Sequence, residues 1–183
     1  SATTLRMTFN EASEMNADLT GWKVGKVETL KYTFDDASKF TGTGLSSWDT
    51  ASATTLVYTF FGASRMNADL SKWDVAKVAN MGNTFTSTTS LSSCNKRKIA
   101  DAWKSSAVFV ATDYDTDWAG EPWCIGAQLN DAQFKQASWD YVQDTGAATT
   151  NWGDIGDLDT SGVTDFSWAF STHRNQAGGS RVN

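Results

Sequence analysis

The sequence predicts an α/β repeat fold, a solenoid in which each coil of about 25 residues contains a short strand and a short helix. Large apolar residues recur at nearly constant intervals: Phe9, Phe34, Phe60 and Phe85, Leu19, Leu45 and Leu70, and Trp22, Trp48 and Trp73. A partial copy at residues 158–170 aligns without a gap on residues 73–85. One coil cannot bury its apolar side alone, so the copies are expected to stack.

Within one coil, residues 70–85 predict the strand and then the helix. The strand matches the leucine-rich-repeat pattern L-x-x-L-x-L at Leu70, Trp73 and Val75, with Trp as the second apolar residue. Alternate residues of such a strand point into the core. The helix has apolar residues spaced by three and four, at Val78, Met81 and Phe85. This spacing is typical of one face of a helix, so the predicted solenoid is leucine-rich-repeat-like.

The extent of the repeat pattern divides the chain into three regions. Residues 1–90 are expected to form a repeat solenoid of three to four coils. Residues 91–124 are expected to cap it, with a helix near 95–105, a short buried strand at 108–110 and an aromatic loop. Ser92 or Ser93 is the expected N-cap of that helix.

Residues 125–183 are expected to supply a helical opening cap and the first coil of a second array. Asn130 with Gln133 fits a capping box, and Leu129 with Phe134 fits a hydrophobic staple. The helix should therefore run to about residue 144, with Gly146 as its stop.

Two cysteines, Cys94 and Cys124, bracket the expected cap. If they pair, closing a loop of about 30 residues contributes roughly 3–4 kcal/mol and implies an oxidising compartment. The alternative is a pair of buried free thiols. We expect the disulfide, and hence a disulfide-stapled C-terminal cap.

Composition and charge exclude several classes of function. The net charge is −6 and no basic stripe exists to neutralise phosphates, which argues against binding to nucleic acid or to anionic membrane surfaces. No apolar run is long enough to insert into a membrane. The only histidine is His173, and no nucleotide-binding motif is present, so we expect neither catalysis nor a cofactor. Because the chain begins at Ser1, we expect a processed or partial protein.

The repeat, read as A-S-x-M-N-A-D-L-S-x-W-D-V-x-x-V-x-x-M-x-x-x-F, resembles the BspA-like leucine-rich-repeat surface proteins. Residues 65–85 carry the match almost whole, and residues 158–170 carry its second half. The segment 93–103, with residues 117–119 and Cys124, looks like the terminator of these arrays in marine algae and other protists. The resemblance covers about 130 of the 183 residues. It implies a secreted or cell-surface protein used in adhesion or protein interaction, with no catalytic residues.

Acidic residues raise the question of calcium. The alternate spacing that begins an EF-hand loop is present at Asp113, Asp115 and Asp117. Trp118 and Cys124 then stand where that loop requires Gly and Glu, which excludes an EF-hand but leaves a looser site with Glu121 open. A second acidic group comprises Asp154, Asp157 and Asp159. Because Asp is common in turns, we expect a structural role for both groups and no bound metal.

A row of polar residues is the candidate partner-binding surface. It follows the core Trp of each coil, or its counterpart Leu158, and comprises Lys23, Asp49, Asp74 and Asp159, with Ser47 and Lys72 beside it. Such a row should project from the strand face, which often binds partners in solenoids. The Asp residues that precede a core Leu or Ile, Asp18, Asp69 and Asp154, are expected to hydrogen-bond their own turns.

These observations predict a non-catalytic protein-interaction or adhesion scaffold, extracellular or on a cell surface, that binds a protein partner. Two alternatives from other classes are a lectin-like glycan-binding module and an architectural subunit of a large algal assembly. In the first alternative, exposed aromatic and Asp residues would hold the sugars.

Overall fold

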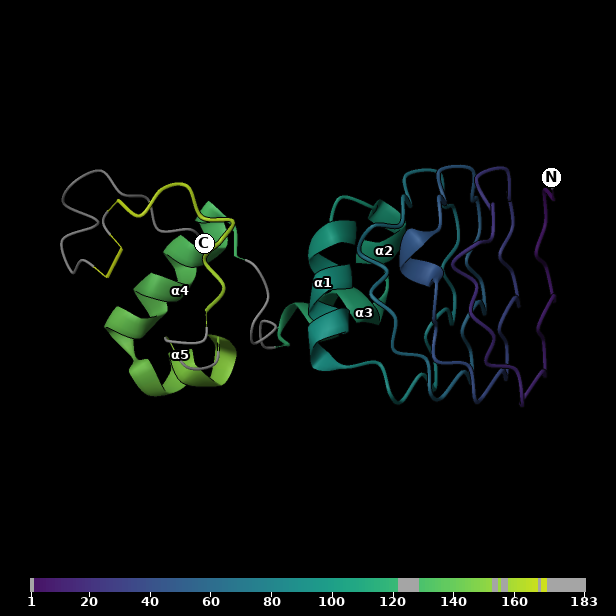
Figure 1. The fold of residues 1–183 in the computed structure, drawn as a ribbon, viewed down its shortest axis with the longest axis horizontal. Coiled ribbons are helices and arrows are strands. Elements are labelled where there is room, and N and C mark those ends of the chain that lie inside the picture. Colours follow the sequence, from purple (N-terminus) through teal and green to yellow (C-terminus); the bar gives the residue numbers. More distant parts are fainter. Residues whose placement is uncertain (1, 122–128, 153–154, 156–157, 168, 171–183) are drawn as a thin grey trace. The chain divides into compact units, whose positions relative to one another are not determined.

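The computed structural model describes residues 2–121, 129–152, 155, 158–167 and 169–170. The chain divides into two compact units, Ser1–Gly120 and Glu121–Asn183, each with its own hydrophobic core. We call them the repeat unit and the C-terminal unit. In the repeat unit the coils lie side by side, and three helices cover the end of the stack (Figure 1).

Each coil of the repeat unit is a succession of tight turns rather than a strand followed by a helix. The described residues contain no β-strand, and isolated parallel bridges set the register at Thr4, Thr29, Thr55 and Asn80. These bridges define coils at 4–28, 29–54 and 55–79 and a fourth that begins at residue 80. Within residues 2–92 the only helical turn is the 3-10 helix η1 (Leu45–Ser47). The expected α/β leucine-rich-repeat-like coil was therefore wrong in both of its elements.

The backbone explains why the helix does not form. The N–H of Thr8 donates to the Leu5 carbonyl at 3.1 Å, which closes a four-residue turn. Its third residue, Met7, has a φ of 60°, and the counterparts Tyr32 and Tyr58 have φ values of 58° and 54°. Type II turns require a positive φ at this position, whereas a right-handed helix cannot contain one. Because successive turns advance by three or four residues, apolar positions keep a helix-like spacing without a helix.

Hydrogen bonds between coils replace the bonds that a helix would have made within each coil. Four N–H groups of the first coil donate to carbonyls of the second coil at 2.7–3.1 Å, those of Leu5, Met7, Phe9 and Glu11. The corresponding four N–H groups of the second and third coils donate to the next coil in the same way. On this side of the stack each coil therefore donates to the coil that follows it in sequence.

Aromatic columns form the core of the stack. Phe34 and Phe60 are fully buried and lie parallel, with ring centroids 5.5 Å apart. Phe9 and Phe85 extend this column at its two ends. The expected burial of Phe34 and Trp48 is confirmed, and the buried rings supply the hydrophobic free energy that the short, irregular turns cannot provide.

A column of buried threonines runs beside the rings. The Thr59 hydroxyl lies 2.7 Å from the Leu56 carbonyl and 3.0 Å from the Leu30 carbonyl of the preceding coil. Thr33 and Thr84 are equally buried and make the corresponding contacts. Each hydroxyl thus finds a partner in the core, at carbonyls that also accept the N–H of the turn in their own coil.

Helix α1 (Ser93–Trp103) caps the carboxyl end of the stack, and Ser92 is its N-cap as expected, accepting from the N–H of Asn95 at 3.3 Å. Helix α2 (Ala107–Val110) occupies the segment for which a strand was expected, and α3 (Asp113–Ala119) occupies the expected aromatic loop, so both expectations were wrong. The ring of Phe85 ends its column against three rings of the cap, those of Trp103, Tyr114 and Trp118.

This aromatic packing attaches the cap to the stack, and no disulfide joins two described residues. The described structure therefore does not show the expected disulfide-stapled cap. Cys94 lies in the first turn of α1 and is not a free thiol. Cys124 lies outside the described residues, so its pairing with Cys94 stays a prediction.

The C-terminal unit is built on α4 (Asp131–Gln143) and α5 (Thr145–Trp152). The capping box of Asn130 and Gln133 is present as expected. The expectation that Gly146 ends the helix was wrong. Gly146 lies in the first turn of α5 and donates its N–H to the Asp144 carboxylate at 2.9 Å. Val163, from the partial copy of the repeat, is buried in the core of this unit.

Candidate interaction surface

Five of the six residues of the predicted contact row lie in the repeat unit, and all five are exposed: Lys23, Ser47, Asp49, Lys72 and Asp74. The sixth, Asp159, is half-buried in the C-terminal unit, where its carboxylate accepts from the N–H and hydroxyl of Ser161. The structure therefore brings together five of the predicted residues, and it describes Asp159 in a separate unit.

The carboxylates of the row have a structural task as well as an exposed position. Asp49 accepts from the N–H of Ala51 at 3.2 Å, and Asp74 accepts from the N–H of Ala76 at 2.9 Å. These bonds close local turns, so the residues do not project from a strand as expected. In each carboxylate one oxygen is used in this way, and the other is available to a ligand.

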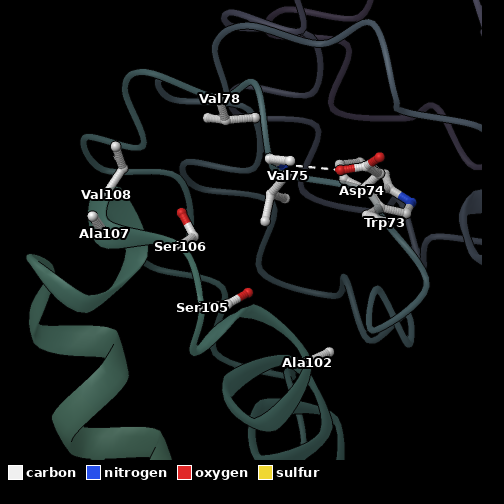
Figure 2. A pocket seen from close by; sticks show the side chains of 10 residues that line it. Trp73, Asp74, Val75, Val78, Ala102, Ser105, Ser106, Ala107 and Val108 are labelled. Atoms are coloured by element: carbon white, nitrogen blue, oxygen red, sulfur yellow. Dashed lines mark hydrogen bonds between the residues drawn. The ribbon is translucent and has the colours of Figure 1, made fainter.

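A groove of about 500 Å³ lies between the third coil and the cap (Figure 2). The third coil contributes the stretch 73–76 and Val78, and the cap contributes Ala102 of α1 and residues 105–108 around the start of α2. Asp74 belongs both to the exposed row and to the lining of this groove. The row and the groove are therefore one continuous surface, which we call the row–groove surface.

The lining combines apolar side chains with a few polar groups. Figure 2 shows the side chains of Val75, Val78 and Val108 around the hydroxyls of Ser105 and Ser106. Asp74 is the one charged residue of the lining, so the groove favours a cationic or hydrogen-bond-donating group next to an apolar one. A volume of this size falls in the range of ligand sites, although such sites are usually more enclosed.

Two basic residues of α1 join this helix to the third coil and to α3. Lys98 bonds to the Asp69 carboxylate of the third coil at 3.1 Å, and Arg97 donates to the Ala119 carbonyl at 2.7 Å. Partial burial opposes ionisation of Asp69, but hydrogen bonds from Ser71 and Lys98 outweigh it and keep the pKa of this carboxyl below its ordinary value. The bond to Ser71 confirms that Asp69 serves its own turn, and Asp18 does the same with Thr20.

The weak metal candidates do not form a site among the described residues. Asp113, Asp115 and Asp117 lie on α3, where residues two apart point to nearly opposite sides of the helix. No group of three or more potential ligands that could hold a metal is found in the described part of the chain. Asp154 and Asp157 lie outside the described residues.

The threonine column and the groove were missed from the sequence. A signal for the column was present, because a Thr precedes the repeated Phe in every coil, at Thr8, Thr33, Thr59 and Thr84. The groove had no comparable signal, since it forms only when the cap segment around Ser105 folds against residues of the third coil.

Comparisons with known proteins give one match. The model of the family described as "Mycoplasma protein of unknown function, DUF285" matches residues 3–117. No curated protein and no solved structure matches the chain. Among the described residues, no helix is both long and apolar enough to cross a membrane.

Proposed function

We propose that this chain, which belongs to the DUF285 family, is a non-catalytic protein-interaction scaffold that works at a cell surface or outside the cell. The repeat unit would be the binding module, and the row–groove surface would be the face that receives a protein partner. The match covers most of the repeat unit, and the description of the family names no activity.

The observation that carries this proposal is the continuity of the row with the groove at Asp74. Five exposed polar residues from successive coils lead into a hollow lined by valine and serine side chains. Protein interfaces have this composition, with an apolar centre that excludes water and a polar rim around it. The groove alone is too small for a stable complex, so the row would supply the remaining contact area.

The chemistry of the surface favours a particular kind of partner segment. Asp49 and Asp74 each keep a carboxylate oxygen that no described residue occupies, while Ser105 offers a hydroxyl within the groove. A peptide segment with a Lys or Arg next to a small apolar side chain would fit both features. The cationic group would lie along the row and the apolar group would enter the groove.

The proposed location rests on the resemblance to BspA-like surface proteins of the algal and protist type, which the repeat and the terminator carry. A disulfide between Cys94 and Cys124 would suit an oxidising, extracellular environment. The bridge is tested by intact mass after alkylation under denaturing, non-reducing conditions, where the addition of two alkyl groups would contradict it.

The binding test removes charge and keeps the fold. In the double variant Asp49→Asn with Asp74→Asn, each side-chain oxygen can still close its turn, but both carboxylate charges are lost. The matched control is Asp115→Asn with Asp117→Asn on α3, which makes the same change of charge elsewhere in the repeat unit. Surface-protein extracts passed over each immobilised protein should give a partner that the wild type and the control retain and the row variant loses.

Two results would contradict the proposal. One is equal retention of the partner by the row variant, which would place binding elsewhere. The other is binding of wild-type protein to a glycan array with no retained protein, which would favour the lectin-like alternative. Circular dichroism and melting temperature of each variant show whether its fold is preserved.

A further inference from the structure

The face of the first coil that points away from the stack is left open. In the aromatic and threonine columns the first member is more exposed than those behind it. Trp22 is 38% exposed, whereas Trp48 and Trp73 are each 3% exposed. Thr8 is exposed, although its counterparts in the other three coils are fully buried. The aromatic and threonine columns therefore end on an uncovered surface.

The backbone of this edge presents carbonyl groups. The second-coil carbonyls that accept from the first coil are those of Thr29, Lys31, Thr33 and Asp35. Their counterparts in the first coil are the carbonyls of Thr4, Arg6, Thr8 and Asn10, and none of these four accepts a bond from the described residues. The open edge thus offers four hydrogen-bond acceptors at the same sequence spacing as the acceptors that join neighbouring coils.

Three of the N–H groups along these four residues are already occupied. Arg6 donates to the Thr4 hydroxyl at 3.1 Å, Thr8 to the Leu5 carbonyl at 3.1 Å, and Asn10 to the Met7 carbonyl at 3.4 Å. A partner at this edge must therefore donate and cannot accept from these positions. Two copies of the chain placed edge to edge would bring these carbonyls against one another, so these positions disfavour a symmetric pair of first coils.

Trp22 adds a donor at a defined place. The indole N–H of Trp48 donates to the Leu19 carbonyl of the preceding coil at 3.3 Å, and that of Trp73 donates to the Leu45 carbonyl at 2.8 Å. The indole N–H of Trp22 has the same position in its coil and no acceptor among the described residues. It is directed to where a preceding coil would place a carbonyl.

We propose that the open face of the first coil is a docking edge for a further coil of this same repeat, which presents its N–H edge to the four free carbonyls. Such a coil would also bring a carbonyl to Trp22 and an aromatic ring to Phe9. The fourth coil of a second copy cannot act as this partner, because its corresponding edge is covered by the cap, where Phe85 donates its N–H to the hydroxyl of Tyr114. The inference does not depend on the proposed function of the row–groove surface.

The sequence allows a clean test. Residues 1–5 and residues 52–56 are both Ser-Ala-Thr-Thr-Leu. A copy of residues 27–51 placed directly before Ser1 therefore reproduces the natural junction between the second and third coils. The control inserts a scrambled version of the same 25 residues. Docking of the added coil should raise the melting temperature of the repeat unit by several degrees over the control. It should also lower the acrylamide quenching of Trp22 several-fold, measured as the difference from the same protein carrying Trp22→Phe.

A second measurement isolates the indole bond. In the parent protein Trp22→Phe should hardly change the melting temperature, because the indole N–H has no acceptor there. In the protein with the added coil the same substitution should lower it clearly, as a buried donor is then lost. An added coil that leaves Trp22 as open to quenching as the scrambled control would overturn the proposal. Loss of the parent's cooperative unfolding transition in the duplicated protein, with the transition kept in the scrambled control, would also overturn it.

Discussion

The indole rings of Trp48 and Trp73 lie 3° from parallel with their centroids 6.0 Å apart, and each ring donates its N–H to a carbonyl one coil back. A stacking contact along the column and a polar contact across it thus come from the same side chain. Neighbouring coils are fixed both in separation and in register by this arrangement. The first three predictions test which of these contacts hold the stack together.

Trp48→Phe should destabilise the protein more than Trp103→Phe. Both rings are buried, but the Trp48 indole donates to Leu19, whereas the Trp103 indole finds no partner among the described residues. Loss of the hydrogen bond should add about 1 kcal/mol to the cost of the smaller ring at position 48. Urea denaturation of the two variants measures this difference. Equal free energies of unfolding would show that the indole bond contributes nothing.

Thr59→Val should lower the free energy of unfolding by about 1–2 kcal/mol, although the two side chains have nearly the same shape. The substitution removes the hydroxyl that bonds to the Leu56 carbonyl in the core. Thr8→Val is the matched control, because Thr8 has the same place in an exposed coil and bonds only to Leu5. The control should change stability by less than about 0.5 kcal/mol. Two variants of equal stability would argue against a role for the threonine column.

Gly44→Ala should prevent normal stacking of the first two coils. Gly44 has a φ of 94°, and a Cβ there would collide with the backbone nitrogen of Thr20 in the preceding coil. Because backbone cannot move aside as a flexible side chain can, we expect a loss of more than about 2 kcal/mol. Gly21→Ala is the control, since no atom lies within 4 Å of its Cβ position. Thermal melts of both variants decide the matter, and a stable Gly44→Ala protein would contradict the packing of these coils.

The bond between Lys98 and Asp69 should make docking of the cap sensitive to acid. The folded state holds the pKa of Asp69 below its ordinary value of about 3.9. A lowered pKa in the folded state stabilises the protein above that ordinary value, and this stabilisation is lost as the pH falls through the folded-state pKa. The protein should therefore lose stability below about pH 4.

Lys98→Met should reduce this loss on acidification, since the wild type has more of the interaction to lose. Lys39→Met serves as the control, because Lys39 and Glu14 form an exposed pair that should contribute little. The free energy of unfolding of all three proteins is compared at pH 7 and pH 3. The same acid dependence in wild type and Lys98→Met would show that this contact does not secure the cap.

The periodicity of the sequence predicted which side chains are buried better than it predicted the path of the backbone. Leu30, Phe34 and Trp48 lie in the core as their spacing requires. The same spacing wrongly suggested a helix, because a run of turns also advances by three or four residues. What decides between the two is the positive φ of residues such as Tyr32, which is uncommon for a side chain of that size and has no signature in the pattern of apolar residues.

The sequence predicted the starts of α1 and α4 correctly, because the capping residues act within one turn of each helix. Ser92 and Asn130 cap the helices for which they were expected, since capping depends on residues within one turn. The short apolar run around Phe109 fits a strand or a helix equally well, and Ser106, which accepts from the N–H of Phe109, makes it helical. The groove beside Asp74 could not be anticipated, because it depends on where the whole cap settles.

The two ends of the column that runs from Phe9 to Phe85 differ in how many rings they contact. The repeat unit should therefore unfold preferentially from one end. Within the column each ring stacks on the rings of the neighbouring coils, so the coils are expected to open one at a time. Phe85 is secured by three further rings, whereas Phe9 has one neighbour in the column and the partly exposed Trp22. Under a pulling force or on heating, the stack should therefore unfold from its amino-terminal coil, and the coils next to the cap should unfold last.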